Sequence, residues 1–572
     1  MEYDPMGNVV RRILPNGAYI VCTYDTEGLL QNMILPDGGT IQYEYDKSGN
    51  RTAIVYPDGG RRTFVYDERD RIIKDTDPGG VYTEYTYDME GRLTRETDME
   101  GRTVCYAYDE AGQLVSETDK LGNKICYTYN ELGKLSSVTD AKKRQTVYVY
   151  EPGGRLSKIE YSDGTYETFV YDRNSNVICR RNRYGNSLHM EYDCLNRLVC
   201  AECNPGGRKS YTYDKTGNMV STTDELGRVT RYTYSPGGRL TSVLDAVGNR
   251  TEYAYDTMGN LICLCRHEGN HVVLGLNGFL NETVQNDGNV RLTRYERDTS
   301  GRIVAVVNPL GDREQYAYDQ MGRIICRTDR DGYETRYLYN QTGDVKDITY
   351  GDGRSVTFSY DSLRRLTEIR DWLGVTCMEM DEAGRLKRTT DHKGNTIFCQ
   401  WNRDGERQAF IYPDGKKVSY IYDEMSRLCQ LTDGYHKVQY LYDTYGRLKE
   451  KILPDGMRTL YAYDLTGRLG GIIHKKNGTF LELWDYEYDM VGNRTAIHKK
   501  RAIAGLGEAE QNQCISEENG SWKYQYDCLN RLTEVQKDGR CLVRYKYDAF
   551  GNRIRKEAAG TTVRYQYDKA DR

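Results

Sequence analysis

The residues whose types most directly suggest chemistry are His267-Glu268-Gly269-Asn270-His271, which match the H-E-x-x-H pattern of zinc proteases. That pattern works on a helix, where the two histidines bind Zn²⁺ and the glutamate is the general base. Here Gly269 falls at a recurring turn position, and Gly and Asn are poor helix residues. We therefore expect a hairpin turn, interpret His267, Glu268 and His271 as a coincidental match, and predict no metal and no cofactor.

The 16 cysteines offer a second kind of chemistry, as disulfides or metal ligands. Cys200 and Cys203 form a lone C-x-x-C pair, with no second pair at zinc-finger spacing. Cysteines that share a register, such as Cys105 and Cys126, should lie two strands apart, about 9.6 Å. A disulfide needs a Cα separation below ~7 Å. We expect most of the cysteines to serve as small apolar residues of strands, and we favour this role over a disulfide framework.

The element that must position these residues is a repeat. Tyr followed by Asp, or a close substitute, recurs every 21 residues from Tyr3 to Tyr360, and Leu276 and Arg297 are the two departures from Tyr. The period then loosens but continues to Tyr567, which gives 27 units in all. An array this regular predicts one supersecondary structure per unit.

Each unit carries two turn signals, Tyr-Asp-x-x-Gly and, ten residues later, Asp-x-x-Gly. The Asp can accept a hydrogen bond from the backbone two residues on, and the Gly can take a positive φ. Together they fit a type I turn followed by a left-handed residue and a bulge. The structural residues that we select in representative units are Tyr87, Asp88, Gly91, Asp98, Gly101, Tyr106, Tyr108, Asp109, Gly112, Asp119, Gly122, Tyr253, Tyr255, Asp256 and Gly259.

Between the turns lie short segments rich in Tyr, Thr, Val and Ile, which are strand formers. We predict an all-β fold, a long antiparallel meander of about 27 hairpins with two strands in each. At ~4.8 Å per strand such a ribbon would be roughly 260 Å long. Because strands twist, a sheet of that length should curl into a hollow shell or spiral.

Composition agrees with a single curled wall. The chain has 572 residues with 57 Gly, 52 Tyr and only 8 Phe, and 38% of its residues are hydrophobic. This is too little aliphatic material for several compact cores. We predict one continuous array over 1–572: a strict register over 1–380, a looser register over 381–497, an insertion loop over 498–521 and final repeats over 522–572.

Several function classes are excluded or disfavoured. The balance of 80 basic and 85 acidic groups excludes a strongly basic nucleic-acid binder, and no apolar run is long enough for a membrane helix. Nucleotide motifs are absent, and turn geometry explains most carboxylates. We therefore expect that the chain is not an enzyme. Exposed Tyr rings could stack on sugars, but we favour packing of the rings along the wall.

The run from Tyr234-Ser235-Pro236-Gly237-Gly238-Arg239-Leu240 through Asp245-Ala246-Val247-Gly248-Asn249 to Tyr253-Ala254-Tyr255-Asp256 resembles the YD repeat of bacterial RHS proteins. The resemblance implies a large β-shell. Similar shells in RHS polymorphic toxins and insecticidal toxin complexes enclose a C-terminal toxic domain, and teneurins use a related barrel in adhesion. Both ends fall within a repeat, and we identify no core-cleavage segment and no toxin domain, so we expect a fragment.

Two functional hypotheses follow from this resemblance. The first is a non-catalytic shell region of a secreted RHS-type toxin, whose partner is the remainder of its parent polypeptide or an encapsulated toxin domain. The alternative is a bacterial cell-surface adhesion or carbohydrate-binding protein, with glycans or cell-surface molecules as partners. Either function implies secretion or surface display, although the chain has no signal peptide of its own.

Overall fold

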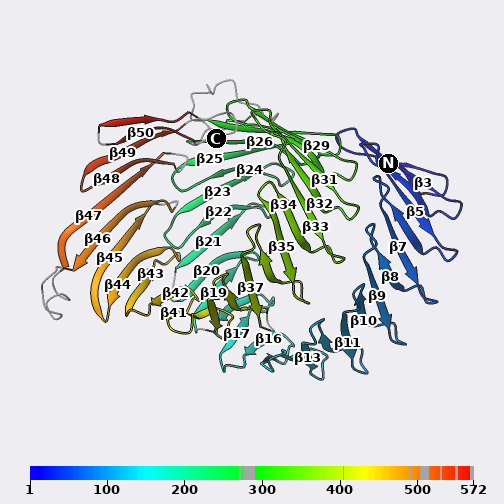
Figure 1. Cartoon of the computed structure of the whole chain (residues 1–572), viewed down its shortest axis with the longest axis horizontal. Coiled ribbons are helices and arrows are strands. Elements are labelled where there is room, and N and C mark those ends of the chain that lie inside the picture. Colours follow the sequence, from blue (N-terminus) through cyan, green and yellow to red (C-terminus); the bar gives the residue numbers. More distant parts are fainter. Residues whose placement is uncertain are drawn as a thin grey trace.

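The computed structural model describes residues 1–572 except 184, 205–206, 269–272, 275–289, 403–404, 490–491, 503–514, 528–530, 548–551, 559 and 567–572. Every regular element in these residues is a β-strand, and the 51 strands form one sheet. Each strand pairs with the next one along the chain in antiparallel fashion (Figure 1). The predicted all-β meander is therefore confirmed.

One unit shows how the sequence builds the sheet. Strands β10 (Leu93–Asp98), β11 (Thr103–Tyr108) and β12 (Leu114–Thr118) pair in order. A register shift, which is a bulge, lies between Ala107 and Tyr108, just before the Tyr-Asp turn. Side chains alternate across a strand. Tyr106 and Tyr108 therefore share one face of the sheet, which we call the tyrosine face, and Ala107 points to the other.

The unit expected around Leu276 does not form its own hairpin in the ladder. Strand β25 (Asn249–Tyr255) pairs with β26 (Leu261–Glu268), and β26 then pairs directly with β27 (Arg291–Arg297). The prediction of an uninterrupted strand array is wrong here. The absence of a donor at the repeat position does not account for this by itself, because Met380 also lacks one and its strand β35 (Gly374–Met380) still pairs with both neighbours. Leu276 itself lies outside the described residues.

Two insertions extend strands. We expected a longer loop near His474–Gly478, but β44 (Leu469–Lys476) and β45 (Thr479–Tyr488) are joined by two residues alone. These are Asn477 and Gly478, with φ of 50° and 91°. That geometry suits a tight hairpin, so the four extra residues lengthen the strands.

The insertion loop predicted over 498–521 is also partly strand. Strand β46 (Arg494–Ala502) and strand β47 (Ile515–Tyr526) both continue into this range, and 503–514 lie outside the described residues. The extension is held by side chains: Trp484 stacks on Trp522 with ring centroids 6.4 Å apart, and Lys499 Nζ lies 2.7 Å from Glu482 Oε2. Stacked aromatics and an ion pair favour a continued ladder.

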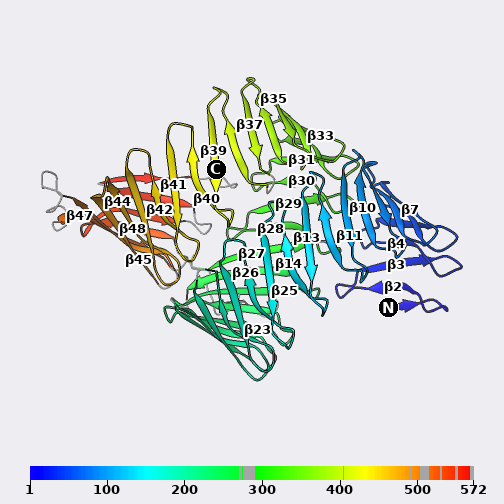
Figure 2. The same cartoon turned by 90° about the horizontal axis from the view of Figure 1, so that it is seen from below.

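The ribbon coils, so that segments far apart in sequence lie side by side (Figure 2). Ser362 Oγ donates to Glu100 Oε1 at 2.8 Å, and Arg323 Nη2 donates to Asp58 Oδ2 at 3.2 Å. In both contacts the second turn of one unit meets the first turn of a unit that begins 273 residues later, thirteen sequence periods along. We call this line of contacts between successive coils the seam.

The wall is one sheet thick, so few side chains are fully buried. The buried positions on the face opposite the tyrosines are mostly small, as in Ala53, Ser116, Ala305 and Ala409. A cluster of buried apolar side chains gathers around β25 and β26 instead. That cluster marks the place where the regular array is interrupted.

Candidate functional site

The repeat tyrosine ties each unit to the one before it. Tyr108 Oη donates to the Leu93 carbonyl at 2.9 Å, and Tyr87 Oη donates to the Ile72 carbonyl at 2.8 Å. The acceptor lies 15 residues earlier, at the start of the neighbouring strand. A buried carbonyl that gains a donor avoids the cost of an unsatisfied polar group. We call this contact the stitch bond.

Residues that replace the repeat tyrosine make the same stitch bond with a different donor. Trp401 Nε1 donates to the Leu386 carbonyl at 2.8 Å. Arg297 Nη2 donates to the Leu261 carbonyl at 3.2 Å, across 36 residues instead of 15. The additional 21 residues are the unit that is missing from the ladder. Donors other than the Tyr hydroxyl can therefore make this bond, although Met380 holds the same position in strand β35 with no donor.

The turn residues form a second network. Asp88 Oδ1 accepts the Arg92 amide at 2.8 Å, and Arg92 Nε donates to Asp88 Oδ2 at 2.7 Å. Arg92 also donates from Nη1 to the carbonyl of Asp109 in the next unit at 3.1 Å, and its guanidinium lies 5.0 Å from the Tyr108 ring centroid. One arginine thus joins two turns and covers a ring, which is a favourable cation–π contact.

The other selected turn residues lie where the repeat placed them. Asp98 is 7% exposed and accepts the Arg102 amide and Lys120 Nζ. Asp109, Asp119 and Asp256 accept the amides four residues on at 2.8 Å. The turn glycines have positive φ: Gly91 88°, Gly101 79°, Gly112 82°, Gly122 79° and Gly259 91°. Tyr253 and Tyr255 lie together on the tyrosine face of β25.

These contacts occupy ring faces and hydroxyl groups that a sugar would need for stacking and hydrogen bonding. Guanidinium groups lie over repeat rings in many units, for example 4.7 Å above the centroid of Tyr87 and 4.9 Å above that of Tyr171. Their hydroxyls also donate to backbone carbonyls. We infer that these side chains mainly stabilise the contact between neighbouring strands of the wall.

A buried carboxylate interrupts this regular pattern. Glu252 in β25 is 2% exposed, and its Oε2 accepts the amides of Val273 and Leu274 at 2.8 and 2.6 Å. Arg250 Nε lies 2.9 Å from the other oxygen. Burial alone would raise the pKa of Glu252, but His267, the two amides and Arg250 outweigh it, so the pKa lies below its usual range.

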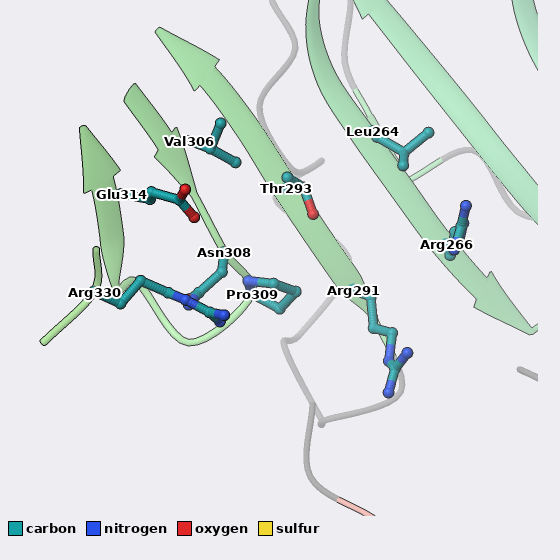
Figure 3. A pocket seen from close by; sticks show the side chains of 9 residues that line it. All are labelled: Leu264, Arg266, Arg291, Thr293, Val306, Asn308, Pro309, Glu314 and Arg330. Carbon is teal, nitrogen blue, oxygen red and sulfur yellow. The ribbon is translucent and has the colours of Figure 1, made fainter. Parts of the chain in front are cut away.

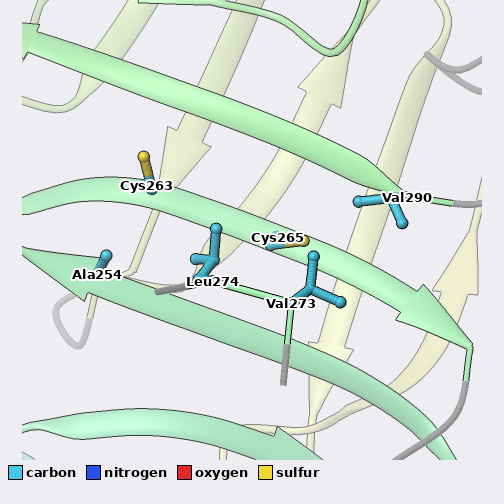
Figure 4. Packing of buried hydrophobic residues seen from close by; sticks show 6 residues of the cluster. All are labelled: Ala254, Cys263, Cys265, Val273, Leu274 and Val290. Carbon is cyan, nitrogen blue, oxygen red and sulfur yellow. The ribbon is translucent and has the colours of Figure 1, made fainter. Parts of the chain in front are cut away.

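Val273 and Leu274 cover the face of β25 and β26 opposite the tyrosines. They are 2% and 7% exposed and pack with Ala254, Cys263 and Cys265 (Figure 4). Glu252 therefore holds Val273 and Leu274 against the wall. The Glu is a weak signal in sequence, because Glu84 occupies the same repeat position and lies exposed.

His267 lies on strand β26, as does the backbone of Glu268, so our prediction of a hairpin turn at these residues is wrong. The ladder continues because His267 pairs with Arg250 and Glu268 with Asn249. His267 Nε2 lies 3.9 Å from Glu252 Oε1. His271 lies outside the described residues. A strand does not provide the helical spacing that H-E-x-x-H needs, and no metal-binding group of residues occurs in the part of the chain that is described.

The cysteines in the described ranges are free thiols. Cys265 is fully buried, and burial, helped by the neighbouring Glu252 charge and Cys263, raises its pKa to about 12. A thiol with such a pKa is protonated at neutral pH and is a poor nucleophile. Cys265, Glu252 and His267 therefore form a packed polar core rather than a nucleophile with its base.

An open pocket of about 320 Å³ lies on the tyrosine face of the same region (Figure 3). Its walls include Leu264, Arg266, Thr293 and Glu314. Glu314 is engaged by Arg327 Nε and Tyr316 Oη, at 2.5 and 2.7 Å. Among the described lining residues there is no Cys, His or Ser, and Thr293 has no histidine beside it in that lining to act as its base.

Comparison with known proteins agrees with this architecture. The profile of the family described as "Teneurin YD-shell" matches residues 1–150, 135–274, 280–455 and 442–572. The chain belongs to the teneurin YD-shell family. Its stitched, coiled ribbon is thus a structural shell repeat, as the resemblance to the YD repeat predicted.

The chain also matches individual proteins at low sequence identity. The chain is 25% identical over 203 residues to "Double-stranded DNA deaminase toxin A" of Burkholderia cenocepacia (strain H111). The aligned region covers 34% of this chain and 14% of the toxin. The crystal structure of TcdB2-TccC3-TEV matches 97% of this chain and 32% of its own at 13% identity, with a TM-score of 0.45. The Photorhabdus luminescens Tc holotoxin pore carrying TccC3-D651A matches 95% and 30% at 14% identity, with a TM-score of 0.44.

This YD-shell chain therefore spans about a third or less of the length of these proteins. Within its described residues, no helix is long and apolar enough to span a lipid bilayer.

Proposed function

We propose that this YD-shell chain is a non-catalytic wall region of a secreted bacterial RHS-type toxin, and that it encloses a toxin domain of its parent polypeptide. The observation that carries the proposal is the seam. Contacts between Arg302 and Asp37 and between Arg323 and Asp58 hold one coil of the ribbon against the next. A seam converts a flat ribbon into a wall that surrounds a space.

Two further observations support a container. The buried groups with nucleophilic or basic chemistry, Cys265, His267 and Glu252, are engaged in packing and hydrogen bonds. The Burkholderia cenocepacia relative is named a toxin, and the matched segment is a small part of it. The toxic activity would then belong to another part of such a protein, and the repeat region would be its wall.

The proposal is tested on the full parent polypeptide, by limited proteolysis of the domain that follows the repeat array. We expect that domain to be cleaved much more slowly in the intact protein than when it is expressed alone. A control protease digest of denatured full-length protein shows that the cleavage sites are present. Equal cleavage rates for the enclosed and the isolated domain would contradict an encapsulating role.

A further inference from the structure

The pocket on the tyrosine face has an excess of positive charge. Strands β26 and β27 form one side of it, and the turns that follow β28 (Ile303–Val307) and β30 (Ile324–Thr328) form the other (Figure 3). Its charged lining residues are Arg266, Arg291, Arg330 and Glu314. Three guanidinium groups and one carboxylate give this lining a net charge of +2. We call the site the arginine pocket.

Two of these arginines lie directly opposite each other on neighbouring strands. Arg266 of β26 pairs with Arg291 of β27, two residues along from the pair formed by Leu264 and Thr293. Side chains alternate across a strand, so all four lie on the tyrosine face. Like charges directly opposite each other in an antiparallel pair are destabilising. An anion bound between the two guanidinium groups would replace this repulsion with attraction.

The one carboxylate of the lining does not neutralise this pair of arginines. Glu314, in β29 (Arg313–Tyr318), accepts hydrogen bonds from Arg327 and Tyr316. Burial raises the pKa of Glu314, but these two donors and the charges of Arg327 and Arg330 outweigh it, so the pKa lies below its usual range. Glu314 is therefore ionised at neutral pH, and its charge is balanced by Arg327, which lies outside the lining.

The rest of the lining suits the body of a small organic molecule. Leu264, Val306 and Pro309 provide apolar surface, and Thr293 provides a hydroxyl group. The volume of about 320 Å³ is at the lower end of the range for small-molecule pockets, which is roughly 300–1,000 Å³. The pocket therefore has room for a charged group together with a compact organic part.

We propose that the arginine pocket binds a small phosphate monoester, such as a sugar phosphate. The phosphate lies between Arg266 and Arg291, with Arg330 facing it from the turn after β30, and the organic part rests on Leu264 and Val306. A phosphate monoester carries a charge of about −1.5 to −2 at neutral pH, which matches the net charge of the lining. Guanidinium groups also bind phosphate oxygens through paired, charge-assisted hydrogen bonds. The proposal does not depend on the container role.

Isothermal titration calorimetry of the whole chain at neutral pH tests the proposal. The probes are glucose phosphate, inorganic phosphate, glucose and glucuronate, which share or lack the sugar ring, the phosphate or the charge. We expect glucose phosphate to bind most tightly, inorganic phosphate and glucuronate more weakly, and glucose not at all. Added salt should weaken the binding of glucose phosphate, because it screens the charges of the open pocket.

Two variants remove guanidinium groups from different elements. Arg266→Gln changes strand β26, and Arg330→Gln changes the turn after β30. Each should weaken the binding of glucose phosphate roughly ten- to hundred-fold, because charge-assisted hydrogen bonds are lost. The matched control is Arg95→Gln, which makes the same change in charge at an exposed position of β10 and should bind as the wild type does.

Hydrogen exchange of β26 and β27 separates a binding role from a structural one. Without ligand, Arg266→Gln should leave the protection of these strands unchanged or increase it, because a repulsive pair is removed. Glucose phosphate should increase protection in the wild type but not in this variant. If Arg266→Gln loosened these strands without ligand, the affinity of Arg330→Gln, which leaves both strands intact, would decide.

Four results would overturn the proposal. Glucose phosphate could fail to bind the wild type, or glucose could bind equally well. Glucuronate could bind as tightly as glucose phosphate, which would assign the pocket to carboxylates. Wild-type affinity in both Arg266→Gln and Arg330→Gln would show that these guanidinium groups do not hold the ligand.

Discussion

Arg297 donates from Nη2 to the Leu261 carbonyl at 3.2 Å, across a segment that contains one complete sequence repeat. In the regular array the donor is a Tyr hydroxyl and the acceptor lies 15 residues back, as for Tyr108 and Leu93. The contact has therefore been kept while its donor and its sequence span have both changed. Chemically different donors thus satisfy the equivalent carbonyl in different units.

The first prediction concerns the donor at Trp401. Trp401→Tyr should keep the bond to the Leu386 carbonyl, whereas Trp401→Phe should lose it, and the two replacements differ only by a hydroxyl. We expect Phe to cost roughly 0.5–1.5 kcal/mol of local opening free energy relative to Tyr. Hydrogen exchange of β36 (Leu386–Thr390) and β37 (Thr396–Trp401) measures the difference. Equal protection in the two variants would show that the hydroxyl contributes nothing.

A second prediction concerns the seam at Gly79. A Cβ added to Gly79 would overlap the Cγ2 methyl group of Thr342 on the next coil, so Gly79→Ala should force the coils apart locally. Small-angle scattering should show a larger radius of gyration, while circular dichroism of the ladder stays unchanged. Thr342→Ala in the same chain removes the clashing methyl group and should reverse most of the change.

The matched control for this substitution is Gly153→Ala. A Cβ added at Gly153 would lie 3.6 Å from its nearest neighbour, Oε1 of the flexible Glu151 side chain. It should leave the scattering profile unchanged. An identical profile for Gly79→Ala would mean that the two coils are not in contact there.

The third prediction concerns the carboxylate of Glu252, which holds Val273 and Leu274 against the wall. Glu252→Gln retains one carbonyl-type oxygen, but its NH₂ group cannot accept a hydrogen bond and the charge near Arg250 is lost. We expect the free energy of local opening at the amides of Val273 and Leu274 to fall by about 1–3 kcal/mol. Hydrogen exchange on peptides containing these residues measures it. Glu44→Gln, at an exposed position, is the control, and unchanged exchange in Glu252→Gln would contradict the pinning role.

The fourth prediction concerns acid. The Arg71 side chain and nearby amides lower the pKa of Asp67 to about 2, against about 3.9 in an unfolded chain. A lowered folded pKa gives stability that is present above pH 4 and is lost as the pH falls from about 4 to about 2. Stability of the wild type should therefore decrease over this range, and Asp67→Asn should reduce the slope. A slope unaffected by the substitution would show that Asp67 does not titrate as described.

Much of the fold was predictable because the 21-residue period encodes local hydrogen bonding. Asp88 and Gly91 define a turn through contacts within five residues, and such short-range chemistry can be read from one unit. The contact between Glu100 and Ser362 was not predictable, because it depends on how far the ribbon curls in each unit. The strand position of His267 was also missed, because the repeat register places a turn there and the longer pairing of β25 with β26 is not encoded in that register.

The coils and the ribbon are held by bonds of different kinds. Along the ribbon, each strand is joined to the next by backbone hydrogen bonds, whereas across the seam the contacts come from single side chains such as Arg323 and Asn186. The work needed to open the wall is thus spread along a line of weak links, and the sheet itself need not break. The coils can therefore separate and close again while every strand keeps its place in the ladder, so opening the seam does not require any strand to refold.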